Sequence, residues 1–367
     1  MLRLDKLQLT QFKNYDYSSF DFTGRVVGIC GKNGKGKTNL LDAIYYVCFT
    51  KSYFSKTEQF NVLFGKEGFR LEANLSSQIV PEDSEALHKF VVIMKPGDKK
   101  QVLLDDVEYE KFSGHIGKFP CVMIAPDDVE IITGSSDLRR KFIDTLLSQT
   151  DRNYLQHLIN YNKIIQQRNS YLKSLSESRS KDFELLDIFD SQLIIPGNYI
   201  HEKRGFFTKT LVPLAKQFYM DISGKEEQIE IKYESQLNNF DLATLLKQTR
   251  EKDLFTLRSN VGIHKDDIIT LLNEMPFKAI ASQGQRKSLL FSLKLAEYEI
   301  LKANKGFAPF LLLDDVFEKL DEIRMNNLLE WVCVHNQGQV FITDTHRDRL
   351  LKALNEIGVE PFIIELN

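Results

Sequence analysis

The stretch from residue 25 to residue 49 constrains the fold more than any other part of the chain. An apolar run, RVVGIC, ends at Cys30, the loop GKNGKGKT fills residues 31–38, and an amphipathic helical sequence follows. The loop matches the pattern G-x-x-x-x-G-K-[ST], in which glycines let backbone N–H groups turn toward phosphate oxygens. A helix that begins after such a loop presents the positive end of its dipole to the same anion. The order strand, loop, helix therefore predicts an α/β fold with a phosphate-binding site.

Each residue of this loop has a predicted role. Lys37 is expected to reach the β- and γ-phosphates of a nucleotide, and the Thr38 hydroxyl is expected to ligate Mg²⁺. The backbone of the remaining loop residues is expected to surround the phosphates: Gly31, Lys32, Asn33, Gly34, Lys35 and Gly36. ATP and Mg²⁺ are therefore the predicted cofactors.

A second nucleotide-binding element is predicted near the other end of the chain, where PFLLLDD occupies residues 309–315. A short continuous apolar run is typical of a strand that is buried on both faces. The acids follow at the carboxyl end of this strand, the edge at which α/β folds place their ligands. We expect Asp314 to hold Mg²⁺ through water and Asp315 to orient or activate the attacking water.

The spacing of apolar residues changes twice in the chain between these two elements. Strand-like segments occupy residues 1–30 and 69–104, and the second group predicts a β-meander attached to the first half of the nucleotide site. From Gly134 to about residue 219 the apolar residues recur with helical spacing, and strand-like segments return at 228–233 and 267–272. We therefore expect a discontinuous ATPase domain at 1–134 and 256–367, with an inserted, mainly helical arm domain at 135–255.

Composition limits the class of protein. Of the 367 residues, 43% are hydrophobic, which is ordinary for a soluble globular protein, and no apolar run approaches the length of a membrane span. The N-terminus lacks the apolar core of a signal peptide, so a cytoplasmic location without membrane contact is expected. The four cysteines lie far apart and are expected to be buried free thiols: Cys30, Cys48, Cys121 and Cys333.

The segment ASQGQRKS, residues 281–288, comes shortly before the acidic strand. Ser282 suits the start of a helix, and backbone donors with small polar side chains at a helix N-terminus form an anion site. The chain already has one such site in its phosphate loop. The economical interpretation is that this second site serves a nucleotide held by another copy of the protein.

The order phosphate loop, long insertion, signature segment, acidic strand and terminal His resembles the head domain of ABC-type ATPases. More specifically, the chain resembles the RecF family of bacterial recombination and repair ATPases. The matching stretches are LQLTQFKNYDY, GKNGKGKTNLLDAIYY, APDDVEIITGSSDLRRKFID, YNKIIQQRNSYLK, VGIHKDD, SQGQRKSL and LLLDDVFEKLD. The resemblance implies an ATPase lobe built from both ends of the chain and a monomer that dimerises around ATP and binds DNA. It also implies that the protein acts with RecO and RecR near single-strand/double-strand junctions, where it helps to load RecA. The implied processes are gap repair, replication and the SOS response.

The resemblance also carries site residues onto this sequence. It implies a signature formed by Ser282, Gln283, Gly284 and Gln285. It implies that Leu320-Asp321 lies in a loop that touches the partner subunit. It also implies that His346, in FITDTH, contacts the γ-phosphate, although the residue fits a solvated surface histidine as well. Asp315 stands where ABC ATPases usually have Glu, so slow hydrolysis is expected. The resemblance implies that DNA stimulates this hydrolysis. The loop that usually carries a Gln reads APDDVE here, and no Mg²⁺ ligand is assigned to it.

A DNA-binding surface has to be local, because the net charge of the whole chain is −3. Residues 139–181 carry nine Lys and Arg against three acids, with Tyr154, Tyr161 and Tyr171 interleaved. The same pattern fits a solvated helical face. With the family resemblance, we expect DNA to contact this segment, chiefly through Arg139, Arg140, Lys141 and Arg152.

Several interpretations stay open at this point. Tyr15 fits either a residue that faces the adenine ring or an ordinary core tyrosine. GIHKDD, residues 262–267, fits either a contact to a DNA junction or a plain turn. Two other functions share the phosphate loop: the ATPase subunit of a membrane transporter, and a P-loop kinase that acts on a small substrate.

Overall fold

The computed structural model of the chain describes residues 1–77, 86–95, 97, 99–178, 183–225, 227–318 and 321–366. Leu320, together with Arg179 and Lys181 of the basic segment, lies outside the described residues. The chain forms two compact units. The first contains residues 1–128, 217–226 and 283–367, and the second contains residues 129–216 and 227–282.

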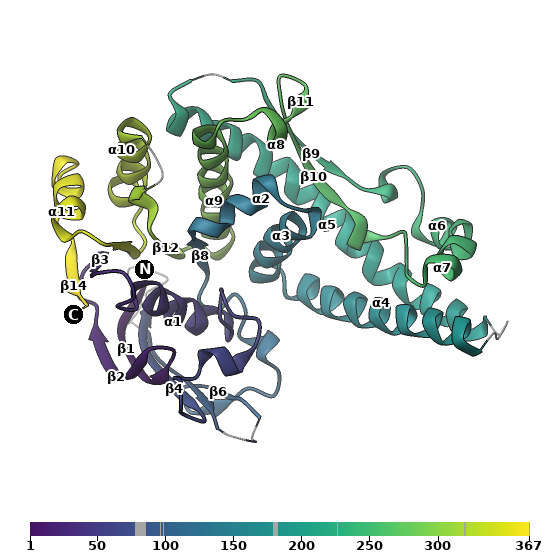
Figure 1. The fold of residues 1–367 in the computed structure, drawn as a ribbon, viewed down its shortest axis with the longest axis horizontal. Coiled ribbons are helices and arrows are strands. Elements are labelled where there is room, and N and C mark those ends of the chain that lie inside the picture. Colours follow the sequence, from purple (N-terminus) through teal and green to yellow (C-terminus); the bar gives the residue numbers. More distant parts are fainter. Residues whose placement is uncertain are drawn as a thin grey trace. The chain divides into compact units, whose positions relative to one another are not determined.

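A parallel sheet of five strands organises the first unit (Figure 1). Its order is β14-β3-β13-β12-β8, and every neighbouring pair is parallel. The strands are Phe362–Glu365, Val26–Cys30, Val340–Asp344, Phe310–Leu313 and Cys121–Ile124, in that order. Strands from the two ends of the chain are thus neighbours, and the three central strands are buried along their whole length, as expected of a covered parallel sheet.

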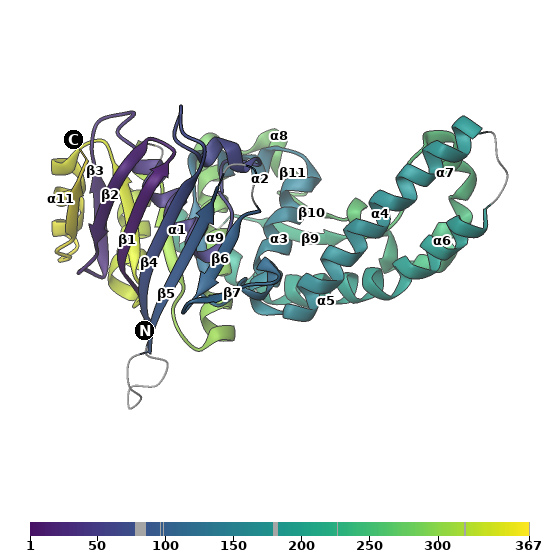
Figure 2. The same ribbon diagram turned by 90° about the horizontal axis from the view of Figure 1, so that it is seen from below.

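A six-stranded antiparallel sheet forms the other layer of this unit, in the order β2-β1-β4-β5-β6-β7 (Figure 2). The strands are Tyr15–Asp21, Leu2–Phe12, Phe69–Ser77, Ala86–Met94, Gln101–Leu104 and Val107–Glu108, in that order. Strands β4, β5 and β6 pair in sequence, so the meander expected at 69–104 is confirmed. Helix α1, Lys37–Phe49, shares one hydrophobic core with both sheets and buries eleven of its thirteen residues.

The remaining helices of the first unit are short, apart from α9. They are α9 Gln283–Lys305, α10 Glu322–Glu330, α11 Arg347–Glu356 and a π-helical turn at Trp331–His335. Short 3-10 turns lie at Glu58–Asn61, Phe112–Gly114, Pro126–Val129 and Val316–Glu318. The four cysteines, all of which the structure describes, are buried and form no disulfide, as expected from their spacing.

The second unit is mainly helical. Its helices are α2 Glu130–Thr133, α3 Ser136–Thr150, α4 Arg152–Ser178, α5 Glu184–Ser223, α6 Leu242–Gln248, α7 Arg250–Thr256 and α8 Phe277–Ile280. A small antiparallel sheet has the order β11-β10-β9, with strands Met275–Pro276, Asp267–Leu272 and Ile229–Glu234. Short 3-10 turns lie at Gln236–Asn238 and Ile263–Lys265. No described helix combines the length and apolar character that crossing a bilayer requires.

The boundaries of the units differ from the expected 134 and 256. The chain stays in the second unit until residue 282, because β10 pairs with β9 from Asp267↔Glu234 to Leu272↔Ile229. The last turns of α5, from residue 217, belong to the first unit, where Phe218 packs edge-on against Trp331. Helical spacing continues through residue 216, so the sequence offers no break at which to place this change.

A buried ion network holds the second unit together. Arg168 of α4 is fully buried and donates to Asp190 Oδ1 at 2.6 Å and to Asp253 Oδ2 at 2.7 Å. The same guanidinium donates to the Ser259 hydroxyl at 2.8 Å. One side chain therefore joins α4 to α5, to α7 and to the segment that follows α7.

Arg168→Met is expected to destabilise the second unit by about 3–5 kcal/mol, because it leaves buried carboxylates without their counter-charge. Amide hydrogen exchange in α4 and α7 should accelerate in this variant. Lys173→Met, at an exposed position of the same helix, should leave the exchange rates unchanged. Equal protection in the two variants would contradict a stabilising role for the network.

Candidate nucleotide-binding site

The phosphate loop connects β3 to α1 at the carboxyl edge of the parallel sheet. The described geometry suits an anion at this place. Gly34 has φ 81°, a conformation that L side chains rarely adopt, and no atom lies within 4 Å of the position that a Cβ would take. The loop thus leaves open space beside its backbone, with the N-terminus of a thirteen-residue helix at its end.

Lys37 is largely buried, although it is a lysine on the first turn of a helix. Its ammonium donates to the carbonyl oxygens of Gly31 at 2.7 Å and of Lys32 at 3.2 Å. These contacts fold the side chain back over its own loop. The positive charge is therefore held against the backbone that the sequence predicts to surround the phosphates.

Thr38 and Asp314, which are 276 residues apart in sequence, meet at this edge of the sheet. The Thr38 hydroxyl lies 2.9 Å from Asp314 Oδ2 and 3.1 Å from Oδ1. Burial raises the pKa of the Asp314 carboxyl, and hydrogen bonds from Thr343 and Thr38 oppose this rise. A hydroxyl and a carboxylate are oxygen ligands of the kind that Mg²⁺ prefers, so the two residues fit a magnesium ion bound together with a nucleotide.

Thr343 supports the two acids of this candidate site and was not among the residues predicted from the sequence. Its hydroxyl donates to Asp314 Oδ1 at 2.8 Å and accepts a hydrogen bond of 2.8 Å from the backbone N–H of Asp315. It thus fixes both acids at the end of β12 from the neighbouring strand β13. A polar residue inside the otherwise apolar run VFIT was the signal for it.

Asp315 and His346 lie after β12 and β13, at the same edge. Asp315 has a left-handed backbone, φ 51°, which is unusual for a residue other than glycine and common at functional sites. The backbone N–H of His346 donates to Asp344 Oδ1 at 2.7 Å, and its side chain is exposed. The sheet therefore brings both predicted residues to the edge at which the phosphate loop begins.

The predicted signature lies where α9 begins. Ser282 and Gln283 are exposed, and Gly284 and Gln285 are half-buried in the first turn of this helix. Asp321, predicted to touch a partner, caps α10 by accepting a hydrogen bond of 3.0 Å from the backbone N–H of Arg324. The roles of these residues depend on a second chain and stay predictions.

Tyr15 is an ordinary core tyrosine in one respect, since only 7% of it is exposed. Its hydroxyl donates to the carbonyl oxygen of Gly36, at 3.0 Å. The contact connects the start of β2 to the phosphate loop. The low exposure of Tyr15 favours its interpretation as a core tyrosine, and the contact with adenine stays a prediction.

Two of the four residues predicted to contact DNA are engaged inside the second unit. Arg139 forms a two-pronged ion pair with Asp267, at 2.7 and 3.0 Å, and Arg140 donates to the carbonyl oxygen of Asp266 at 2.6 Å. Lys141 and Arg152 are exposed. Arg139 thus pairs with an acid of GIHKDD and Arg140 with its backbone, which helical spacing did not show. The contact of these two residues with DNA stays a prediction.

Two of the three tyrosines interleaved in the basic segment are buried inside the second unit. Tyr154 and Tyr161 are fully buried, and the Tyr161 hydroxyl lies 2.9 Å from His264 Nδ1. They are therefore not available to stack on bases. The carboxylate of Asp266 accepts a hydrogen bond of 2.8 Å from Arg204, so GIHKDD is a structural anchor for the helices of this unit.

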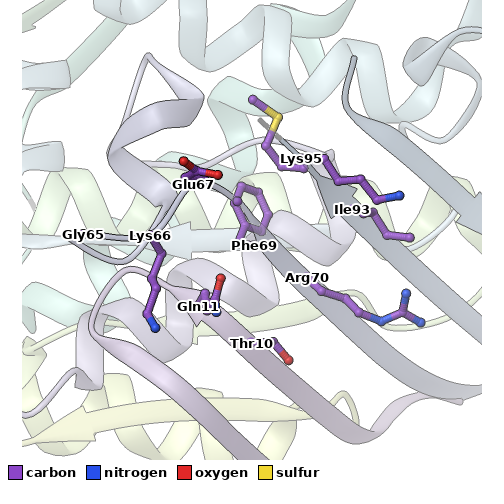
Figure 3. Close-up of a pocket in the computed structure, with 11 residues that line it drawn as sticks. Thr10, Gln11, Gly65, Lys66, Glu67, Phe69, Arg70, Ile93 and Lys95 are labelled. Atoms are coloured by element: carbon purple, nitrogen blue, oxygen red, sulfur yellow. The ribbon is translucent and has the colours of Figure 1, made fainter. Parts of the chain in front are cut away.

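A separate hollow of about 530 Å³ lies on the first unit, over the ends of β1, β4 and β5 (Figure 3). Lys66, Arg70 and Lys95 give it a positive rim, and Glu67 adds one acid. The Arg70 guanidinium is paired with Glu72 at 2.6 Å, and Lys66 lies 3.9 Å from Asp16. None of the residues that line the hollow belongs to the phosphate loop, so it is not part of the nucleotide site.

This chain is similar to known proteins over nearly its whole length. The family described as RecF/RecN/SMC N terminal domain matches residues 3–361. The DNA replication and repair protein RecF of Flavobacterium johnsoniae is 41% identical over 348 residues, which are 95% of each chain. The RecF of Cytophaga hutchinsonii is 39% identical and covers 94% of this chain and 90% of its own.

Solved structures agree with this assignment. A structure of the recombination mediator protein RecF-ATPrS in the RecFOR pathway superposes with a TM-score of 0.87 and 29% identity, over 100% of this chain and 96% of its own. A structure of RecF-ATP gives a TM-score of 0.85 and 31% identity, over 94% and 92%. An Smc head domain from Pyrococcus furiosus, at 16% identity and a TM-score of 0.55, shares the fold. The chain has the fold of an ABC-type ATPase head and belongs to the RecF family.

Proposed function

We propose that this chain is an ATP-dependent DNA-binding repair protein of the RecF type, in which ATP binding and hydrolysis act as a switch. The observation that carries the proposal is the meeting of Thr38 with Asp314 at the carboxyl edge of the parallel sheet. Two solved relatives are described as RecF with ATP or with ATPrS, and membership of the family supports ATP binding and hydrolysis.

In the proposed site the loop N–H groups and Lys37 bind the β- and γ-phosphates. Thr38 and Asp314 would hold Mg²⁺, which supplies positive charge beside the phosphates. Asp315 orients the attacking water, and His346 contacts the γ-phosphate. The shorter side chain of Asp315, compared with Glu, makes hydrolysis slow, as suits a switch.

The proposed site is completed by a second copy of the chain. Its signature residues Ser282, Gln283, Gly284 and Gln285 contact the γ-phosphate across the interface, and the loop at Leu320-Asp321 touches the partner. ATP therefore promotes a two-fold homodimer with two equivalent composite sites. Hydrolysis separates the copies again.

The DNA ligand is duplex DNA, including single-strand/double-strand junctions. We propose that the dimer acts with a RecR-type mediator and with RecO to help load RecA during single-strand gap repair, replication and the SOS response. The relatives are a DNA replication and repair protein and a recombination mediator of the RecFOR pathway, and both descriptions support this role. They favour it over a transporter subunit or a small-substrate kinase.

The direct test of this function compares DNA binding in different nucleotide states. A labelled duplex should bind more tightly with ATP than with ADP or without nucleotide, since only ATP joins two DNA-binding chains. Equal affinity in the three states would contradict the switch.

The exposed basic residues of α4 provide a test of the DNA surface. Reversing Lys163 and Lys173 to Glu should weaken DNA binding and flatten the dependence of log affinity on log salt by about 0.9 for each phosphate that the side chains no longer neutralise. The matched control is Lys209→Glu, an exposed charge of the same sign on α5. If control and test variants bind alike, the face of α4 is only solvated. Arg139 is unsuitable for this test, because its reversal would place a carboxylate against Asp267.

A further inference from the structure

Two consecutive residues contact the phosphate loop: Asn14, in the turn after β1, and Tyr15, the first residue of β2. Tyr15 is buried and donates its hydroxyl to the carbonyl oxygen of Gly36, at 3.0 Å. Burial raises the pKa of Tyr15, so the phenol keeps its proton and remains a donor. The ring packs edge-on against Phe20, with 5.8 Å between the ring centroids.

Asn14 makes two contacts on the same side of the loop. Its amide nitrogen donates to the carbonyl oxygen of Lys35 at 3.4 Å, and its amide oxygen accepts from Asn39 of α1 at 2.7 Å. At Gly36, φ is 101°, and a Cβ would lie 2.6 Å from the Asn14 amide nitrogen and 2.8 Å from the Tyr15 hydroxyl. The two side chains therefore fill the space beside Gly36 and meet consecutive carbonyl groups of the loop.

These contacts determine where the loop's N–H groups point. In a planar trans peptide the carbonyl and the following N–H point in opposite directions. A hydrogen bond that fixes the carbonyl of Gly36 therefore orients the N–H of Lys37, and one that fixes the carbonyl of Lys35 orients the N–H of Gly36. The Gly36 carbonyl also accepts the first helical hydrogen bond of α1, from Leu40 at 2.9 Å, which ties this orientation to the helix.

We infer that Asn14 and Tyr15 are positioning residues, which hold the N–H groups of Gly36 and Lys37 ready for phosphate oxygens before ATP arrives. The inference rests on the proposed function, because it requires that the loop binds ATP. It assigns to Asn14 and Tyr15, the last two residues of FKNY (12–15), a role in the affinity for ATP. This role is separate from contact with the adenine ring.

Tyr15→Phe is the sharpest variant, because it removes one hydroxyl and keeps the packed ring. The Kd for ATP, measured by calorimetry on the full chain, should rise about three- to tenfold, the usual effect of one hydrogen bond. The KM should rise with it, while kcat changes less than about twofold, because saturating ATP holds the loop in the same geometry. The matched control is Tyr17→Phe on the same strand, whose residue is 64% exposed and whose hydroxyl accepts from Gln8 at 3.5 Å.

The inference is overturned if Tyr15→Phe and Tyr17→Phe bind ATP with the affinity of the unmodified chain, even where Tyr15→Phe lowers the melting temperature. Should Tyr15→Phe fail to fold, Asn14→Ala at an exposed position takes its place, and unchanged affinity there overturns the inference equally. An unmodified chain that does not bind ATP would overturn the proposed function as well. Normal binding by the unmodified chain separates the two failures.

Discussion

Lys37→Met is expected to reduce the affinity for ATP about 10- to 100-fold, because it removes a charge-assisted contact to the phosphates. Turnover should fall by about two to three orders of magnitude, as when an enzyme is deprived of a donor that stabilises the transition state. The structure adds a reason to choose Met, since the stem of Lys37 is largely buried and an apolar chain of similar length keeps its packing. Calorimetry and a phosphate-release assay measure the two effects.

The control for this variant is Lys56→Met, which removes an exposed lysine of the first unit that lies outside the loop. It should bind and hydrolyse ATP nearly as the unmodified chain does. Unchanged affinity and unchanged turnover in Lys37→Met would contradict the assignment of the phosphate loop.

Ser282→Arg is expected to leave ATP binding by the single chain nearly intact and to abolish ATP-dependent dimerisation and hydrolysis. The reason is that a bulky cation would enter the proposed contact with the partner's γ-phosphate, whereas Lys37, Thr38 and Asp314 stay unchanged. Calorimetry, light scattering with and without ATP, and phosphate release separate the three effects. Ser282→Ala, which adds no bulk, should retain dimerisation.

Mixing Ser282→Arg chains with Lys37→Met chains tests the partnership itself. One composite site of such a heterodimer combines an intact loop from the first chain with an intact signature from the second. Turnover in the mixture above the sum of the separate variants would support action in trans. Normal dimerisation and turnover by Ser282→Arg alone would refute it.

The phosphate loop could be predicted from the sequence because its chemistry is local. Glycine spacing, a lysine and a hydroxyl residue stand within eight positions, between an apolar strand and a helix. Asp314 could be predicted in the same way, from the acid that ends a buried strand. Parallel strands then bring the two elements together at one edge of the sheet.

The contacts that support these residues could not be predicted, because they join distant parts of the chain. Thr343 supports Asp314 only because β13 is the neighbour of β12 in the sheet. Tyr15 reaches Gly36 across 21 residues, through a side-chain contact that has no periodic signal.

For the basic segment, residues 139–181, the sequence shows the number of charges but not which of them are exposed. Its charge count was correct, but a count does not distinguish exposed residues from paired ones. Arg168 is fully buried in an ion network, and Arg139 is paired with an acid 128 residues away. Lys141 and Arg152 have similar sequence surroundings and are exposed. Only the pairing of β9 with β10, which places GIHKDD against α3 and α5, decides between these outcomes.

ATP turnover by the unmodified chain with Mg²⁺, measured with and without duplex DNA, decides whether ATP use is linked to DNA. We expect slow turnover that duplex DNA increases and that Lys37→Met lowers by about two to three orders of magnitude in both conditions. Turnover that does not respond to DNA, or that survives in Lys37→Met, would contradict the claim that this chain is a DNA-linked ATPase built on the phosphate loop.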